Sequence, residues 1–418
     1  MSRLADTLVP ARLGDRFRRL VLSSWVTNLG DGIAIAAGPL LVASQTHDPF
    51  LVALAGLLQR LPYLLFGLVA GALADRVSRK AIVVAGDLLR CVILVCLSLM
   101  IVTGHVSVAG VLVVMFLLGL AETFVDTTSS TLLPMLVEDK ADYGVANSRL
   151  MAGFITANQL AGPPIGAMLF AAGMWLPFVT QALCVALGAR LVSQIAIPGP
   201  VREPGRKGHI RRDIGEGLAW LWANPPVRTL ALTIVTFNVT YAAAWSVLVL
   251  YATLRLDLGA VGFGLITTAM ALGGLVGTAM YGWLERRVSL ANIMRTGLIL
   301  ETLTHLALAL TTVAWVALVV FFLFGAHAFI WGTTSHSIRQ RAVPTEFQGR
   351  VGSVYMIGVV GGMVVGGLVG GLIAQQWGIV APFWFGFVGS AAILAAIWRQ
   401  LTHIAHADEQ ARGATIRA

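Results

Sequence analysis

Charged side chains are scarce in this sequence of 418 residues, because Asp, Glu, Lys and Arg together supply only 12% of it. A soluble globular domain carries roughly 25% charged residues, so a soluble fold is excluded for the bulk of the chain. Hydrophobic residues make up 57% and fall into long runs. Runs of about 20 apolar residues can cross the hydrocarbon core as helices. The sequence therefore predicts an all-α protein that crosses a membrane many times.

Cysteine and the common catalytic motifs are also rare or missing. The three cysteines, Cys91, Cys96 and Cys184, fall inside apolar runs, where small buried hydrophobic residues are expected rather than a disulfide or a metal site. The sequence has no His-Glu-x-x-His, no Gly-x-Ser-x-Gly and no Gly-Lys-Ser/Thr phosphate loop. We therefore predict no enzyme, no metal and no cofactor. The rival class is a membrane scaffold, or a polytopic enzyme that uses Glu122 and Asp126 as its carboxylate pair.

Turn signals and charges divide the apolar runs into twelve predicted spans, near residues 18–45, 50–74, 81–103, 107–134, 144–170, 174–196, 227–254, 260–284, 290–313, 316–338, 351–375 and 379–400. The longest interruption, 198–226, is rich in Pro, Gly and Arg. We interpret it as a linker between two six-helix halves, 1–197 and 227–401, with a tail at 402–418. Within the linker, apolar residues at helical spacing predict a helix that is either bound to the membrane surface or solvated: Ile210, Ile214, Leu218 and Leu221.

Basic residues decide the predicted orientation. The net charge of +9 could indicate nucleic-acid binding, but such sites gather basic residues on one soluble face, whereas here they recur at intervals between apolar runs. Alternate loops contain no Lys or Arg, namely 46–50, 103–107, 171–176, 311–315 and 375–381, and Arg255 is the one basic exception on that side. Both termini are therefore expected in the cytoplasm. The amino terminus has no short apolar core that ends in a cleavage site, so we expect no removable signal peptide.

A charged turn separates the second and third predicted spans, where residues 71–80 read Gly-Ala-Leu-Ala-Asp-Arg-Val-Ser-Arg-Lys. Gly71 allows close helix contact, and Asp75 can meet the positive end of a neighbouring helix. The basic members mark the cytoplasmic face: Arg76, Arg79 and Lys80. This wording resembles the signature loop of the major facilitator superfamily and departs from it mainly at Ser78, where the family has glycine.

Span five contains Gly153, then eight residues, then Gly162-Pro163-Pro-Ile-Gly166-Ala167. Small residues let another helix contact the backbone, and prolines remove hydrogen-bond donors and bend the helix. The order is similar to the antiporter motif of the same superfamily, with Ala167 in place of the last glycine. In that family the motif goes with exporters rather than uptake carriers. Simple glycine-mediated packing is the alternative.

The resemblance covers nearly the whole chain and implies the major facilitator fold, two pseudo-symmetric six-helix bundles around a midplane cavity. Residues 133–137 (Leu-Pro-Met-Leu-Val), 146–148 (Ala-Asn-Ser) and 349–351 (Gly-Arg-Val) resemble the branch of bacterial siderophore and macrolide exporters. The resemblance implies a monomeric antiporter of the bacterial plasma membrane that exports small amphipathic compounds such as drugs and is driven by the proton gradient. Export or flipping of a siderophore, lipid or metabolite, or uptake, stays open as the alternative.

Ionisable side chains near the middle of a span cost about 3 kcal/mol on insertion scales, so they are candidates for function. A rise of about 1.5 Å per residue places Asp31, Glu122 and Glu301 near the midplane. A carboxylate in a low-dielectric cavity can switch between charged and neutral forms, so these three are predicted proton-coupling residues. Arg60 could instead neutralise Asp31 or Glu122 permanently. Glu301 and His305 form either a proton relay or a fixed hydrogen-bonded cluster.

Asp126 lies one turn beyond Glu122 toward the cytoplasm and is shallow enough to meet Arg76 or Arg79. In the family a carboxylate of span four joins the signature loop in a charge relay. The resemblance therefore implies a conformational latch, composed of Gly71, Asp75, Arg76, Arg79, Lys80, Asp126 and Arg350. A plain charge at a helix end is the alternative for Asp126. Asp87 and Arg90, three residues apart on span three, are predicted to satisfy each other near the cytoplasmic side.

Aromatic side chains with a few polar groups suit an amphipathic ligand. The predicted substrate-cavity residues lie on spans one, two, seven and ten: Asn28, Gln59, Arg60, Asn238, Tyr241, Trp245, His327 and Trp331. Packing between helices is the alternative for each aromatic residue. Trp175, Trp315 and Trp377 are expected in the interfacial belt.

Overall fold

The computed structural model describes residues 11–74, 76–137, 139, 142–196, 210–344 and 347–401. Every regular element within these residues is a helix. In chain order they are η1 Ala11–Leu13, α2 Gly14–Gln45, α3 Pro49–Ala74, α4 Arg79–Val102, α5 Val108–Ser129, α6 Leu133–Leu136, α7 Tyr143–Gly153, η3 Phe154–Ala161, α8 Gly162–Ala172, α9 Leu176–Ser193, α10 Ile210–Ala223, α11 Pro225–Trp245, α12 Leu248–Leu250, η4 Tyr251–Arg255, α13 Ala260–Arg287, α14 Leu290–Leu310, α15 Ala314–Ala342, α16 Gln348–Trp377 and α17 Ala381–Ile397.

Among the described residues, ten helices are long and apolar enough to cross a membrane: α2, α3, α4, α5, α9, α11, α13, α14, α15 and α16. The fifth predicted span is three consecutive segments, α7, η3 and α8. The twelfth is α17, which is apolar but has only 17 residues. The predicted all-α, multi-pass membrane protein is confirmed.

The chain divides into two compact units. Unit 1 comprises Met1–His47, Ala55–Pro204 and Leu258–Thr268, and unit 2 comprises Asp48–Leu54, Gly205–Asp257 and Ala269–Ala418. The first residues of α3 thus belong to unit 2, while the rest of α3 belongs to unit 1. The reverse holds for α13, whose first residues belong to unit 1. The sequence boundaries at 198 and 226 do not reveal this exchange of helix ends.

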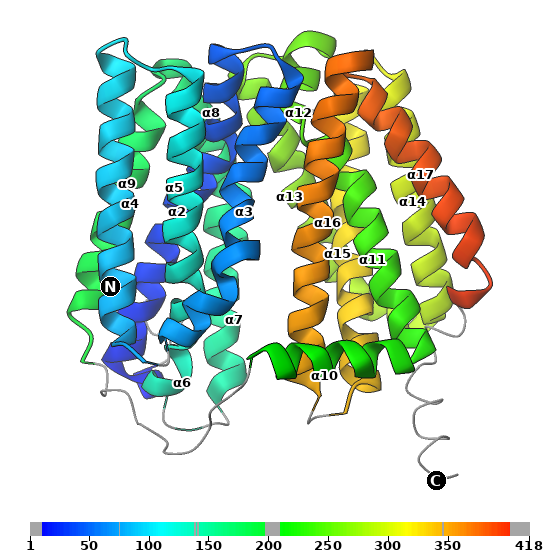
Figure 1. Cartoon of the computed structure of the whole chain (residues 1–418), viewed down its shortest axis with the longest axis horizontal. Coiled ribbons are helices and arrows are strands. Elements are labelled where there is room, and N and C mark those ends of the chain that lie inside the picture. Colours follow the sequence, from blue (N-terminus) through cyan, green and yellow to red (C-terminus); the bar gives the residue numbers. More distant parts are fainter. Residues whose placement is uncertain are drawn as a thin grey trace. The chain divides into compact units, whose positions relative to one another are not determined.

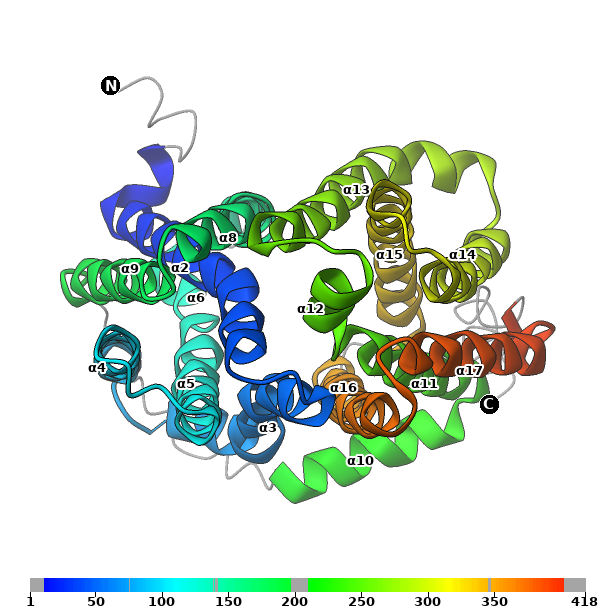
Figure 2. The ribbon, with the colours of Figure 1, turned by 90° about the horizontal axis from the view of Figure 1, so that it is seen from above.

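Helices pair in the same order within each unit. In unit 1, α2 packs against α8 and α9, and α4 packs against α5 and α9. In unit 2, α11 packs against α16 and α17, and α14 packs against α15 and α17. Figures 1 and 2 show α4, α5 and α9 together in unit 1, and α14, α15 and α17 together in unit 2. Duplicated transporter halves leave this kind of internal repetition.

Local sequence chemistry sets several helix ends. Serine hydroxyls accept a backbone N–H at the starts of α4, α5 and α14, namely Ser78, Ser107 and Ser289, which satisfies donors that have no partner inside the helix. Two spans contain non-α segments, because η3 and η4 are π-helices. Such segments occur frequently at functional sites.

The linker contains the predicted helix as α10, which crosses the ends of α16 and α11 and packs against them (Figure 1). Leu221 is buried in the core of unit 2, while Leu218 and Trp222 are exposed. The three cysteines are free, and Cys96 is exposed rather than buried as expected. Cys96 lies on α4 among exposed apolar residues such as Val95 and Leu99, so the thiol belongs to an outer face of the helix.

Candidate functional site

The centre of unit 1 contains a buried charge cluster built from three helices. Arg90 of α4 is 1% exposed, and its Nη1 donates to Asp87 Oδ1 at 3.2 Å. Its Nη2 pairs with Asp31 of α2 and with Glu122 Oε1 of α5, the latter at 3.3 Å. One guanidinium thus binds three carboxylates, and the cluster holds α2, α4 and α5 together. Burying a charge is tolerated only when it is paired and hydrogen-bonded.

Two amides complete the charge cluster. Gln181 Nε2 of α9 donates to Asp31 Oδ1 at 3.2 Å, and Gln59 Nε2 of α3 lies 3.5 Å from Glu122 Oε2. Close helix contact places them there: a side chain at Gly119 of α5 would clash with the backbone of Gln59. Gln59, predicted to contact substrate, therefore contacts a candidate coupling carboxylate.

The cation that neutralises Asp31 and Glu122 is Arg90, and not Arg60 as the alternative proposed. Arg60 is exposed, and its Nη1 lies 3.5 Å from the carbonyl oxygen of Gly56 on its own helix. The predicted Asp87–Arg90 pair exists, but it belongs to a larger cluster rather than to the cytoplasmic end. Arg90 lies eleven residues after the first residue of α4, about 16 Å along the helix, so its depth could have identified it.

Two basic residues of the turn between α3 and α4 make contacts within unit 1. Lys80 Nζ donates to the carbonyl oxygen of Ile195 at 2.9 Å, and Arg79 Nε donates to that of Ala74 at 3.3 Å. The side chain of Asp126 forms no hydrogen bond or ion pair with a described residue. Asp75 lies outside the described residues. Gly71 has no side chain, and the Arg76 side chain forms no hydrogen bond or ion pair with a described residue. The latch remains a prediction.

The antiporter motif surrounds the π-helix η3. Its eight intervening residues, Phe154–Ala161, form η3, and Pro163 stands at the start of α8. A side chain at Gly162 would clash with Gly32 of α2, and one at Gly166 would clash with Ile33. A side chain at Gly153 would clash with the indole of Trp25, whose Nε1 donates to the carbonyl oxygen of Arg149 at 3.0 Å.

The motif therefore fixes α2, the helix of Asp31, tightly against the fifth span. Asn158 of η3 strengthens this contact, because it is buried and its Nδ2 donates to the carbonyl oxygen of Asn28 at 3.3 Å. Sequence reasoning missed Asn158, although a polar amide between the glycines of the motif was a visible signal. A π-helix directly precedes the prolines of the motif, and the predicted bend at the prolines stays a prediction.

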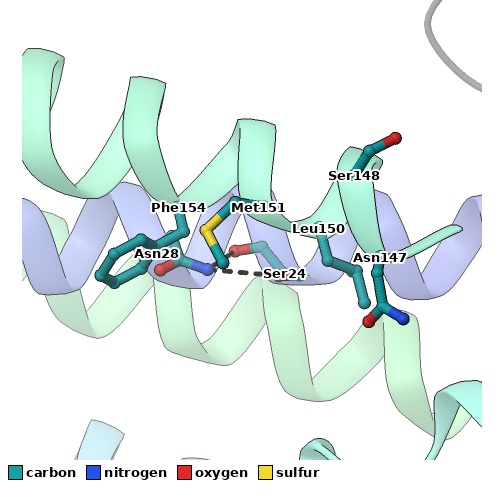
Figure 3. Close-up of a pocket in the computed structure, with 7 residues that line it drawn as sticks. All are labelled: Ser24, Asn28, Asn147, Ser148, Leu150, Met151 and Phe154. Carbon is teal, nitrogen blue, oxygen red and sulfur yellow. Dashed lines mark hydrogen bonds between the residues drawn. The ribbon is translucent and has the colours of Figure 1, made fainter. Parts of the chain in front are cut away.

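A groove of about 540 Å³ opens between α2 and the fifth span (Figure 3). It is lined by Ser24, Asn28, Asn147, Ser148, Leu150, Met151 and Phe154. Asn28 Nδ2 donates to the carbonyl oxygen of Ser24 at 2.7 Å and lies 3.2 Å from its Oγ. The lining combines apolar side chains with uncharged polar groups. Asn28, a predicted substrate residue, lies one turn before Asp31 on α2.

The predicted substrate residues of unit 2 contact different neighbours, and their role in a substrate cavity stays a prediction. Asn238 donates to the carbonyl oxygen of Ile234 on its own helix at 2.8 Å. Tyr241 and Trp245 belong to an aromatic cluster with Phe324, whose ring centroid lies 5.1 Å from that of His327. The remaining one, Trp331, packs against Gly297, where an added side chain would approach its ring to 2.7 Å.

Arg350 binds the linker helix. Its Nη1 lies 2.9 Å from Glu216 Oε2 of α10, and its guanidinium lies 5.7 Å from the ring centroid of Phe347. Trp220 of α10 stacks on the same Phe347 ring at 5.9 Å. The start of α16 is therefore attached to α10.

No group of three or more His, Cys, Asp or Glu side chains among the described residues is arranged to hold a metal ion. Glu301 lies on α14 near the histidine pair, but the three side chains do not form such a group.

Comparison with known proteins agrees with these features. The family model described as transmembrane secretion effector matches residues 5–415. The multidrug efflux pump Tap of Mycolicibacterium fortuitum is 28% identical over 365 residues, which cover 82% of this chain and 84% of the pump. The enterobactin exporter EntS of Shigella boydii serotype 4 (strain Sb227) is 27% identical over 361 residues, covering 83% and 82%.

Two solved structures share the fold. The nucleoside transporter NupG has a TM-score of 0.70 at 11% identity and covers 94% of this chain and 99% of its own. A bacterial homologue of the iron transporter ferroportin, in an inward-facing state, has a TM-score of 0.73 at 16% identity and covers 93% and 98%. At such identities the likeness concerns the fold alone, and it confirms the predicted major facilitator fold.

Proposed function

The chain belongs to the transmembrane secretion effector family of the major facilitator superfamily, and we propose that it is a proton-driven exporter of small amphipathic compounds. The observation that carries this proposal is the surplus of carboxylates in the charge cluster. Asp31, Asp87 and Glu122 all bind Arg90, and one guanidinium balances only one of them. A proton on a carboxylate of the cluster would reduce this imbalance.

Exposure separates the roles of the three carboxylates. The side chain of Asp87 is 3% exposed, whereas those of Asp31 and Glu122 are 28% and 22% exposed. A sealed carboxylate beside Arg90 is the permanent counter-ion, and partly exposed carboxylates can exchange protons with solvent. We therefore assign proton coupling to Asp31 and Glu122, with Asp87 as the residue that keeps Arg90 in place.

Cargo and proton would act on the same helix. The groove reaches Asn28, one turn from Asp31, and α2 carries both residues. Protonation of Asp31 weakens its bond from Arg90, which loosens α2 from α4 and α5. Cargo in the groove contacts α2 and the fifth span. These two elements move as one body, because glycines of the fifth span hold them in close contact. Antiport requires that the transporter binds the proton and the cargo in alternation, and α2 would carry both binding positions.

The groove favours an amphipathic cargo, because its polar groups are uncharged and its other wall is apolar. Drug export is supported by the relation to the multidrug efflux pump Tap. Siderophore export is the second candidate, supported by the relation to the enterobactin exporter EntS. We further propose a monomer in a bacterial plasma membrane with both termini in the cytoplasm, on the basis of the basic loops.

The test uses proteoliposomes loaded with ethidium, an amphipathic cation, and an imposed pH gradient. We expect gradient-driven ethidium efflux from the native protein, and at least a tenfold loss in Asp31→Asn or Glu122→Gln with ethidium exchange retained. The matched control is Asp15→Asn, because Asp15 lies on the same helix but its side chain is 89% exposed. Proton coupling would be refuted if the native protein exported ethidium and a panel of amphipathic compounds at the same rate with and without the pH gradient.

A further inference from the structure

Unit 2 contains a second cluster of buried polar rings, formed by Trp245, His305 and His327. His305 of α14 is 0% exposed and His327 of α15 is 5% exposed. The Trp245 ring lies 6.0 Å from that of His305 and 4.6 Å from that of Phe324, which lies 5.1 Å from His327. We call these three nitrogen-bearing residues the ring cluster.

Five nitrogens of the ring cluster are buried without a hydrogen-bond partner among the described residues: Trp245 Nε1 and both ring nitrogens of His305 and His327. Buried polar atoms are nearly always bonded, because an unmade bond costs free energy. A neutral imidazole offers one donor and one acceptor, which suits small polar guests such as water, and it can also accept a proton. The described residues thus supply no hydrogen bond to these five nitrogens, and both expectations for His305, a proton relay and a fixed hydrogen-bonded cluster, stay predictions.

Glu301 places a carboxylate one turn from His305 on α14. It forms no hydrogen bond or ion pair with a described residue. The helices α15 and α17 pack against α14, and α11 contributes Trp245. On these helices no acidic residue occurs, and the basic residues lie at helix ends, far in sequence from the ring cluster: Arg228 on α11, and Arg339 and Arg341 on α15.

The other titratable neighbours are few. Tyr241 of α11 stacks on Trp245 at 4.6 Å, and the hydroxyl of Tyr251 donates to the carbonyl oxygen of Leu308 at 2.6 Å. Arg295 lies on α14 itself, nearer its first residue, and Nη2 donates to the carbonyl oxygen of Trp398 at 3.3 Å. No described cation thus pairs with Glu301, in contrast to the carboxylates around Arg90.

The ring cluster occupies the positions that correspond to the charge cluster in the repeated fold. Arg90 and Glu301 each lie eleven residues after the first residue of the third helix of their unit, α4 and α14. Glu122 lies fourteen residues after the first residue of α5, and His327 lies thirteen after that of α15. Ionisable groups therefore recur at matching depths on matching helices.

The seventh span changes direction beside the ring cluster. The helix α11 ends at Trp245, and Val247 (φ −112°, ψ 14°) leaves the helical conformation before α12 and the π-helix η4. Broken helices line the sites of many transporters. The break in the helix next to Trp245 provides a hinge that could respond to charge on His305.

We propose that Glu301, His305 and His327 form a second, internally hydrated proton site that takes up one further proton in each transport cycle. This proposal rests on the proposed proton-driven export and adds a proton to it. Protonation of His305 would place a positive charge one turn from the Glu301 carboxylate on α14. Release of that proton would restore the neutral rings.

The test measures the charge moved per exported ethidium in proteoliposomes, from the membrane potential that just balances a known ethidium gradient at equal pH. Ethidium carries one positive charge outward and each coupled proton carries one inward, so the net inward charge per ethidium is the number of protons minus one. We expect the double variant His305→Gln/His327→Gln, and separately Glu301→Gln, to move one positive charge fewer inward per ethidium than the native protein while pH-driven efflux remains. Thr304→Val is the matched control, because Thr304 is buried on α14 and its hydroxyl bonds only to its own helix.

An unchanged charge per ethidium in both variants would overturn the second site. Loss of pH-driven efflux in Asp31→Asn concerns the charge cluster alone, so failures of the two proposals are distinguishable. If the variants do not transport, nitrogen NMR of the native protein with labelled histidine decides instead. The proposal requires a histidine signal that changes charge between pH 5 and 9 and disappears in His305→Gln or His327→Gln, and it is overturned if neither ring titrates.

Discussion

The two units place ionisable residues at matching depths but stabilise them in opposite ways. In unit 1, Asp31, Asp87 and Glu122 share Arg90, whose guanidinium joins three helices. In unit 2, Glu301 has no cation partner among the described residues, and the histidine rings lack hydrogen bonds. The two repeated halves thus carry ionisable residues at matching positions, but these residues are ion-paired in unit 1 and unpaired among the described residues in unit 2. Ion pairs transmit a charge change directly between helices, whereas an unpaired cluster can do so only after it binds a proton.

Removal of the shared cation should have the largest effect. Arg90→Leu would leave three carboxylates in the interior of unit 1 without their partner, and loss of one partner of a buried ion pair costs about 3–5 kcal/mol. We expect a large fall in the thermal unfolding temperature in detergent, together with loss of transport. Arg60→Leu is the control, because Arg60 is exposed and binds only its own helix.

Arg90→Lys sharpens the result, because one ammonium keeps the charge but cannot present the planar fork that reaches three carboxylates. An intermediate loss of stability is expected. Equal stability of the Leu variant and the native protein would contradict the assignment of Arg90 as the common counter-ion.

The glycine contacts of the fifth span should show the next largest effect. Gly166→Leu forces a side chain against the backbone of Ile33, and overpacking costs about 1–3 kcal/mol. Because this contact attaches α2 to the fifth span, we expect slower ethidium efflux as well as lower stability. Gly367→Ala on α16 is the control, since nothing lies within 4 Å of its added carbon. Similar effects of both substitutions would remove the special role of the motif glycines.

The attachment of α10 to α16 should contribute least. Glu216→Gln breaks the ion pair with Arg350, in which each side chain is 33% exposed. Partly exposed pairs contribute about 0.2–1 kcal/mol, so a small decrease in unfolding temperature is expected, and high salt should produce the same decrease in the native protein. Gly217→Leu provides the stronger test of the contact, because its side chain would approach the Arg350 backbone to 2.7 Å. A destabilisation by Glu216→Gln as large as that of Arg90→Leu would contradict this ranking.

Much of the fold could be predicted, because apolar runs and basic loops are local properties of the sequence. The twelve spans and the linker helix follow from them, and the signature loop and the antiporter motif indicated the family. The exchange of helix ends between units and the π-helix η3 could not, since both depend on contacts between distant segments. Prolines in the motif indicated a bend, but nothing in the sequence indicated the π-helix that precedes Pro163.

The site was predicted in part. Midplane depth identified Asp31 and Glu122, which the structure brings together on one cation. It did not identify that cation, because Asp87 and Arg90 satisfy each other at helical spacing and a local pair needs no distant partner. Gln181 was missed for a related reason: a single amide in an apolar helix has no spacing pattern, and its role appears only when α9 meets α2.

The central claim is that the charge cluster couples proton movement to export. The most direct measurement follows the internal pH of proteoliposomes with a trapped fluorescent indicator while an outward ethidium gradient is the only driving force. The account predicts that native protein acidifies the interior as ethidium leaves, that Asp15→Asn does the same, and that Asp31→Asn and Glu122→Gln do not. Ethidium efflux without any change of internal pH in the native protein would contradict it.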